Sequence, residues 1–88
     1  MQLAAKHPET ISALERFYHT VRKVGWYGIN DVRQQFPSAD QVGNVLIFNV
    51  MGGNYRLITT VHYPTQRLFV KVLLTHREYD RKEWLKWA

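Results

Sequence analysis

Four side chains in the second half of the sequence could together act on a phosphodiester, and they are Arg56, Lys71, His76 and Tyr79. The two cations could stabilise the charge that grows on phosphate oxygens, while the imidazole and the phenol could carry protons. An imidazole titrates near neutral pH, whereas a phenol, whose pKa is about 10, suits an acid, a hydrogen-bond donor or a stacking surface. Such a set could break RNA by attack of its own 2′-hydroxyl, a reaction that needs no cofactor.

Each of these residues also has a purely structural interpretation. Arg56 could be a surface cation beside a turn, and Lys71 could be a strand lysine that guards against edge pairing. His76 could be only the second residue of a capped turn, and Tyr79 could pack its ring over the edge of a sheet. The residue types alone leave both interpretations open.

The chain is basic, with 12 Lys and Arg residues against 7 Asp and Glu residues and a formal charge of +5. A small basic domain suggests an anionic partner, most often nucleic acid, although modest positive charge can also serve only solubility. We expect RNA contacts from four further cations, which are Arg67, Arg77, Arg81 and Lys82.

Composition also argues against several classes of site. The chain has no cysteine, which excludes disulfides, thiolate metal sites and cysteine nucleophiles. No metal site is expected, because no ligand-like spacing connects the histidines, which are His7, His19, His62 and His76. No apolar run approaches the ~18 residues of a membrane span, and the opening segment lacks the order of a signal peptide. A cytoplasmic location is therefore expected.

The first part of the chain has the pattern of two helices. Apolar residues recur at spacings of three and four from Pro8 to Val24, which predicts a helix that ends at Gly25. Its core face is expected to hold Ile11, Leu14, Phe17, Val21 and Val24. Asn30 is expected to cap a short second helix from Asp31 to Phe36.

A β region follows the helices. Residues Ser38 to Asn44 are expected to form a loop, or at most one capped turn, before three strands. The predicted strands are Val45–Met51, Tyr55–Tyr63 and Arg67–Leu74. Gly52-Gly53-Asn54 and Pro64-Thr65-Gln66 are expected to connect them, because these residue types favour turns. The pattern therefore predicts a three-stranded antiparallel meander.

Alternation gives the last two predicted strands one apolar face each. Leu57, Thr59 and Val61 share a face of the middle strand, and the last strand presents a run of Leu68, Val70, Val72 and Leu74. Arg56 and Lys71 lie on the opposite face. Cations among apolar neighbours indicate that this face is open to solvent or to an anionic ligand.

Two capping-box spacings follow the last strand, Thr75 with Glu78 and Asp80 with Glu83. They predict a short C-terminal helix, and the role expected for Asp80 is mainly to cap it.

The C-terminal helix would carry Trp84 and Trp87 on one face, where they could lie on the sheet or on a partner.

At 88 residues, the whole chain is expected to be a single domain over residues 1–88. We predict the α+β class, with two N-terminal helices packed on a three-stranded antiparallel sheet and a short helix at the end.

Several ordered segments carry a family resemblance. They are the helical stretch from Lys6 through Trp26, then Phe36–Asp40, Phe48–Leu57 and Thr75–Asp80. In this order they resemble the HigB-type toxins of bacterial toxin–antitoxin modules, which are RelE-like mRNA interferases. Members usually begin with a basic β-strand. That strand is expected to be missing here, because the chain opens almost within the helical region, so that either the fold has lost an edge strand or the chain is shortened.

The resemblance implies a RelE-like α/β fold and cleavage of mRNA, generally on the ribosome, without a metal ion or other cofactor. It also implies neutralisation by a helix-turn-helix antitoxin of the HigA type. Contact with DNA would then be only through the antitoxin, and no membrane partner is expected. The alternative is a non-catalytic basic module that binds RNA or joins the antitoxin complex, which the missing first strand favours.

Overall fold

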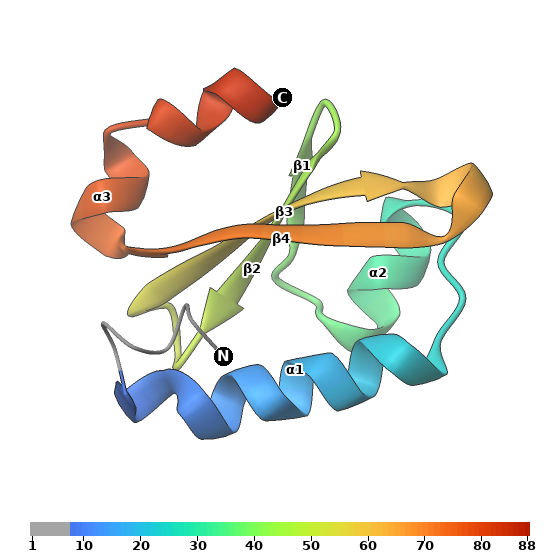
Figure 1. Ribbon diagram of the computed structural model, residues 1–88, viewed down its shortest axis with the longest axis horizontal. Coiled ribbons are helices and arrows are strands. Elements are labelled where there is room, and N and C mark those ends of the chain that lie inside the picture. The colour runs from blue at the N-terminus through green and yellow to red at the C-terminus, as the bar shows by residue number, and fades with distance from the viewer. Residues whose placement is uncertain (1–7) are drawn as a thin grey trace.

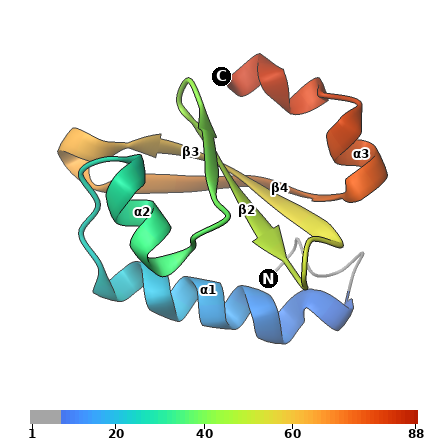
Figure 2. The ribbon, with the colours of Figure 1, turned by 180° about the vertical axis from the view of Figure 1, so that it is seen from behind.

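The computed structural model describes residues 8–88 and arranges them in three layers, with helices on both faces of one antiparallel sheet (Figure 1, Figure 2). This arrangement confirms the predicted α+β class. A short 3-10 turn opens the described chain, and the elements that follow are α1 (Ile11–Lys23), α2 (Ile29–Gln35), β1 (Asp40–Val42), β2 (Val45–Val50), β3 (Tyr55–His62), β4 (Arg67–Thr75), α3 (His76–Asp80) and the 3-10 helix η4 (Glu83–Trp87).

The boundaries of both N-terminal helices differ slightly from the predicted ones. Helix α1 ends at Lys23, because Val24 is already extended, so the chain leaves the helix before Gly25. Helix α2 begins at Ile29, and the prediction that Asn30 caps it is wrong. The Asp31 carboxylate accepts the backbone N–H of Tyr27 at 2.9 Å, which draws the start of the helix toward the preceding turn.

The sheet has four strands in the order β1-β2-β3-β4, one more than predicted. The additional strand, β1, lies in the segment expected to be a loop. Val42 pairs with Val45, which leaves only Gly43 and Asn44 in the connection. Gly43 has a φ of 57°, which suits a two-residue hairpin turn, so this Gly-Asn pair was the overlooked signal.

Strand β4 contains a bulge opposite the middle of β3. Ile58 pairs with Val72 and Thr59 pairs with Val70, so Lys71 has no partner across the ladder. One extra residue inverts the alternation of a strand. Even-numbered residues of β4 therefore face one side of the sheet before Lys71 and the other side after it.

The bulge changes which β4 residues face the helices. Leu73 lies in the core with α1 and α2, whereas Val72 packs on the opposite face beside Trp84. The prediction that one apolar face of the last strand holds all four of its predicted members is therefore wrong. These members are Leu68, Val70, Val72 and Leu74.

Strand β2 is buried on both faces. Four consecutive residues are at most 2% exposed, and they are Val45, Leu46, Ile47 and Phe48. On the face under α1 and α2, the Phe48 ring lies 4.7 Å from the Phe17 ring and 5.1 Å from the Phe36 ring, measured between centroids. This first layer of the core is therefore aromatic.

The C-terminal segment covers the other face of the sheet. Trp84 is buried there against Val45, Ile47 and Ile58, and Trp87 packs beside it. Of the two predicted positions for the tryptophans, the one on the sheet is confirmed. The prediction of an open second face is wrong around Trp84, because the tail fills that area.

One of the two predicted capping boxes is present. Thr75 and Glu78 exchange both hydrogen bonds of the motif at the start of α3. The second box is absent, because Lys82, with a φ of 61°, takes the N-cap position of η4 and Asp80 belongs to α3.

Two expectations concern residues 1–7, namely the missing N-terminal strand and the surroundings of His7. Both lie outside the described residues. Within residues 8–88, no helix is both long enough and apolar enough to cross a membrane.

We predict that Trp84→Ala lowers the free energy of unfolding by about 3–5 kcal/mol, because it empties the apolar layer between the tail and the sheet. Urea denaturation followed by far-UV circular dichroism measures this. Leu85→Ala is the matched control, and its exposed side chain should contribute about 0.5 kcal/mol or less. Equal losses for the two variants would contradict the packing of the tail on the sheet.

Candidate active site

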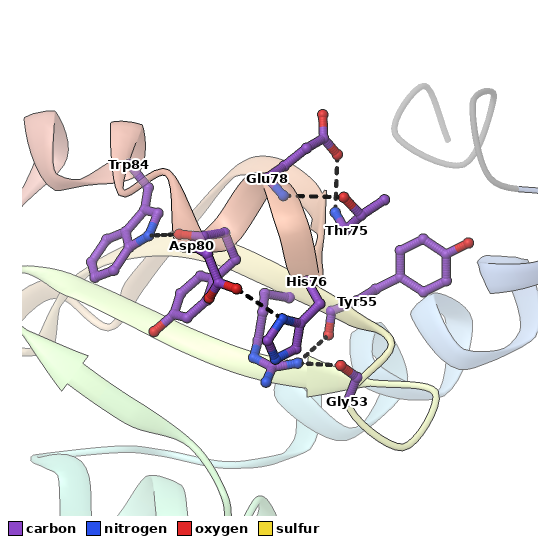
Figure 3. Close-up of polar contacts among 9 residues, drawn as sticks. Gly53, Tyr55, Thr75, His76, Glu78, Asp80 and Trp84 are labelled. Atoms are coloured by element: carbon purple, nitrogen blue, oxygen red, sulfur yellow. Dashed lines mark hydrogen bonds and ion pairs between the residues drawn. The ribbon is translucent and has the colours of Figure 1, made fainter.

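Arg56 is the centre of the candidate site, and the first hairpin of the sheet holds it in place. Its guanidinium donates hydrogen bonds to the carbonyl oxygens of Gly53 and Tyr55 (Figure 3). The same group lies over the ring of Tyr79, with Cζ 5.3 Å from the ring centroid. Within the described part of the chain, no carboxylate forms an ion pair with Arg56. Because a guanidinium carries five N–H donors, some remain to bind phosphate oxygens.

Tyr79 is held by packing as well as by Arg56. Its ring stacks on that of Trp84, with centroids 5.2 Å apart and planes within 2° of parallel. The Trp84 indole N–H also donates to the Tyr79 carbonyl oxygen at 3.1 Å (Figure 3). The buried tryptophan therefore fixes both the ring and the backbone of Tyr79.

The surroundings of Tyr79 keep its hydroxyl protonated. Partial burial raises the pKa of this phenol above its ordinary value, and the carboxylates of Asp40 and Asp80 raise it further. Arg56 acts in the opposite direction and lowers the pKa, but the other influences prevail. Near neutral pH the hydroxyl is therefore a proton donor, and it does not act as a base.

His76 and Asp80 form a pair on the exposed side of α3. The Nδ1 atom of His76 lies 3.1 Å from the Oδ2 atom of Asp80, one helical turn away (Figure 3). When Nδ1–H donates to this carboxylate, Nε2 is the ring atom left to accept a proton. The role predicted for Asp80, capping the tail helix, is replaced by this contact with His76.

Lys71 projects from the bulge of β4 and is exposed. Its Nζ atom lies 5.9 Å from the centroid of the Phe69 ring, and Phe69 pairs with Thr60, which shares the face of Arg56. Arg56, however, pairs with Leu74, three residues farther along β4. That offset is roughly 10 Å along the strand, so the two cations share a face without lying in contact.

The other predicted RNA contacts fall into two groups. Arg77, Arg81 and Lys82 are exposed on and just after α3, at the end of β4 that carries the candidate site. Arg67 begins β4, eight residues before Thr75 at the other end. Because a strand rises about 3.3 Å per residue, Arg67 is about 25 Å away from that group.

Two members of this neighbourhood were not predicted for the site. Asp80 was assigned to a cap, although its spacing of four from His76 on a helix was the available signal. Asn49 is exposed and pairs directly with Arg56 across β2 and β3. The register of the hairpin would have indicated this neighbour, because the turn that sets it was recognised.

Residues 8–88 contain no group of three His, Asp or Glu side chains placed to hold a metal ion. The chemistry available from the described residues is therefore that of a guanidinium, a protonated phenol, an imidazole paired with a carboxylate, and nearby ammonium groups.

Comparison with known proteins gives a consistent match. The model of the HigB toxin family, described as a RelE-like toxic component of a toxin–antitoxin system, matches residues 10–82. The chain is 28% identical over 83 residues to the mRNA interferase HigB of Escherichia coli O6:H1 (strain CFT073), covering 91% of this chain and 81% of that protein. It is also 28% identical over 80 residues to the mRNA interferase toxin HigB of Escherichia coli strain K12, covering 88% and 77%.

We predict that Arg56→Ala raises the pKa of Tyr79 further, because it removes the positive charge that lowers it, and that Asp40→Asn lowers this pKa. NMR titration of protein labelled with ¹³C at tyrosine Cζ measures both, with Tyr79→Phe to assign the signal. Lys71→Ala is the control and should leave the titration unchanged. A Tyr79 pKa that moves in none of the variants would contradict the contact between Arg56 and the ring.

The same shift has a consequence for stability. The pKa of Tyr79 is higher in the folded protein than the value of about 10 expected for the unfolded chain. Its contribution to stability is therefore complete below about pH 10 and is lost as the pH rises through the folded-state pKa.

Proposed function

The chain belongs to the HigB toxin family, the RelE-like toxic component of a toxin–antitoxin system, and on this basis we propose that it is an endoribonuclease that cleaves mRNA. Two relatives are named mRNA interferases, which supports the substrate. The structural observation that carries the proposal is the half-buried guanidinium of Arg56 against the protonated phenol of Tyr79. A cation and an acid are the groups that phosphodiester cleavage requires.

The proposed reaction is attack of a 2′-hydroxyl on the adjacent phosphate. His76 takes the hydroxyl proton on Nε2, and Asp80 stabilises the imidazolium that forms. Arg56 binds the phosphate oxygens on which negative charge grows, and Lys71 contributes at longer range. Tyr79 donates a proton to the departing 5′-oxygen, or donates a hydrogen bond to it while water supplies the proton. The P–O5′ bond breaks as the new P–O2′ bond forms, which leaves a 2′,3′-cyclic phosphate and a free 5′-hydroxyl.

We propose that Arg77, Arg81 and Lys82 bind the RNA backbone on either side of the cleaved bond. Their exposure and their position next to α3 support this role. Arg67 lies too far along β4 to contact the same nucleotides.

Further proposals follow from family membership. The substrate is mRNA on the ribosome, so the protein acts in the cytoplasm, with residues 1–88 as one domain and no metal ion in the reaction. Its antitoxin is a helix-turn-helix protein of the HigA type, and contact with DNA is made only through that antitoxin.

We predict that Arg56→Ala lowers the rate of mRNA cleavage about a hundredfold or more, as does the loss of one oxyanion donor in other enzymes. The assay uses purified protein and ribosome-bound mRNA, with cleavage sites mapped by primer extension. Lys71→Ala should lower the rate less.

Arg56 also donates a hydrogen bond to the hairpin turn. Arg56→Lys therefore serves as a control, because it keeps the positive charge but loses the forked donor geometry of the guanidinium. Melting temperatures are measured for every variant. Parent-like rates for both Arg56→Ala and Lys71→Ala would remove this face from the active site. RNA binding without cleavage by the parent protein would instead support the non-catalytic module.

We predict that His76→Ala lowers the cleavage rate and flattens its pH profile between about pH 5 and 8, because the imidazole that takes the proton is gone. Asp80→Asn should act in the same direction with a smaller effect. The measurement is single-turnover cleavage across this pH range. Parent-like rates and profiles for both variants would show that the pair is structural.

Tyr79→Phe separates two roles of the ring. A large loss of rate in this variant means that the hydroxyl donates a proton or a hydrogen bond. A parent-like rate in Tyr79→Phe, together with a deficient Tyr79→Ala, means that the ring stacks on a base. Thermal melting must accompany Tyr79→Ala, because this change also removes the stack on Trp84.

A further inference from the structure

A hollow lies at the opposite end of the molecule from Arg56. It is a cavity of about 420 Å³ between the end of α1, the segment that leads into α2 and the β3–β4 turn. Its apolar lining comes from Val21, Val24, Val61 and Leu68. A hollow of this kind takes an aliphatic side chain.

The walls of this cavity are joined by the side chain of Gln66. Its Oε1 atom accepts the backbone N–H of Trp26 at 2.9 Å, and its Nε2 atom donates to the Trp26 carbonyl oxygen. Gln66 itself has a φ of 55°, so the turn presents this side chain toward the α1–α2 connection. The cavity is therefore a built feature of the fold, held by a reciprocal pair of hydrogen bonds between segments 40 residues apart.

The cavity is positively charged. Arg22 and Arg67 are exposed and contribute to its lining, and among residues 8–88 no carboxylate does. Arg22 is positioned by the ring of Tyr18, with Cζ 5.4 Å from the ring centroid. Trp26, another lining residue, has a buried indole N–H that finds no hydrogen-bond partner among the described residues. Two exposed guanidiniums beside an aliphatic wall call for a ligand with a carboxylate next to an apolar group.

The lining favours a peptide over RNA. Recognition of unpaired RNA uses exposed rings on which bases stack. The aromatic residues of this cavity are not available in that way, because Trp26 is buried and the partly buried Tyr63 packs against the core. Acidic and aliphatic side chains on one peptide segment would match both parts of the lining.

We propose that this cavity binds a segment of the antitoxin in which an acidic side chain stands next to an aliphatic one. The aliphatic group would fill the hollow and the carboxylate would lie between Arg22 and Arg67. The identity of the partner rests on the toxin function proposed above. The contact lies about a full strand length from the Arg56 site, so losing it impairs neutralisation while cleavage continues.

The test measures antitoxin binding and mRNA cleavage on the same set of full-length variants. The probe is the purified antitoxin encoded beside the toxin gene, with affinity measured by isothermal titration calorimetry. Arg22→Glu combined with Arg67→Glu should weaken binding by about a hundredfold or more, as expected when charged pairs in an interface become repulsive. Cleavage without antitoxin is compared in Arg22→Glu alone and should stay within about threefold of the parent rate, since Arg22 takes no part in the reaction.

Lys23→Glu is the matched control for charge. It reverses a cation in the same last turn of α1 but does not line the cavity, and it should bind the antitoxin as the parent does. Val24→Phe fills the hollow without changing charge and should also weaken binding. This variant keeps the test valid if the double charge reversal fails to fold.

Parent-like affinity in both the charge-reversed and the filled variants would overturn the proposal. So would a loss of RNA binding or cleavage in the charge-reversed variant with antitoxin binding unchanged, because the cavity would then be an RNA contact. A parent protein that binds the antitoxin but cleaves no mRNA would refute the proposed enzyme and leave this inference standing.

Discussion

The burial of β2 on both faces is the constraint on which the rest of the molecule depends. A central strand with four consecutive buried apolar residues is stable only if each face of the sheet is covered. Helices α1 and α2 cover one face. The chain is short, so the only described element left for the other face is the segment after β4, and Trp84 is its anchor.

The candidate site follows from this packing. Trp84 stacks on Tyr79, Tyr79 lies beneath the guanidinium of Arg56, and Arg56 is tied to the hairpin turn by hydrogen bonds. Trp84 thus has two roles. It holds the ring of Tyr79, whose hydroxyl is the proton donor, and it closes the apolar layer between the tail and the sheet. Such coupling keeps the candidate site rigid in a small protein, where few residues are available for a separate supporting layer.

The two ends of β4 have different surroundings. At one end, α3 brings an imidazole, a phenol and several cations beside the hairpin that carries Arg56. At the other end, Gln66 joins the β3–β4 turn to the α1–α2 connection. The hollow beside this contact is lined by aliphatic side chains and by two arginines. This separation is what the two proposals require, since one surface would act on RNA while the other would bind a protein partner.

Much of this protein is determined by local sequence. The periodicity of α1, the Gly52-Gly53 turn and the Thr75–Glu78 capping box each act through neighbours in the chain, so they could be predicted. The residue types at Arg56, His76 and Tyr79 likewise indicated their chemistry, although the sequence alone could not decide between catalytic and structural roles.

Tertiary structure decided the features that need contacts between distant residues. The bulge at Lys71 lets Leu68 and Leu73, which are five residues apart, both face the core under α1 and α2, and strict alternation along one strand cannot reveal that. The pKa of Tyr79, a residue of α3, depends on Asp40, which lies far away in the sequence in β1. Whether Trp84 lies on this sheet or on a partner was open in the sequence, because an amphipathic tail buries its apolar face on any suitable surface. The fold settled it by leaving one face of β2 for Trp84 to cover.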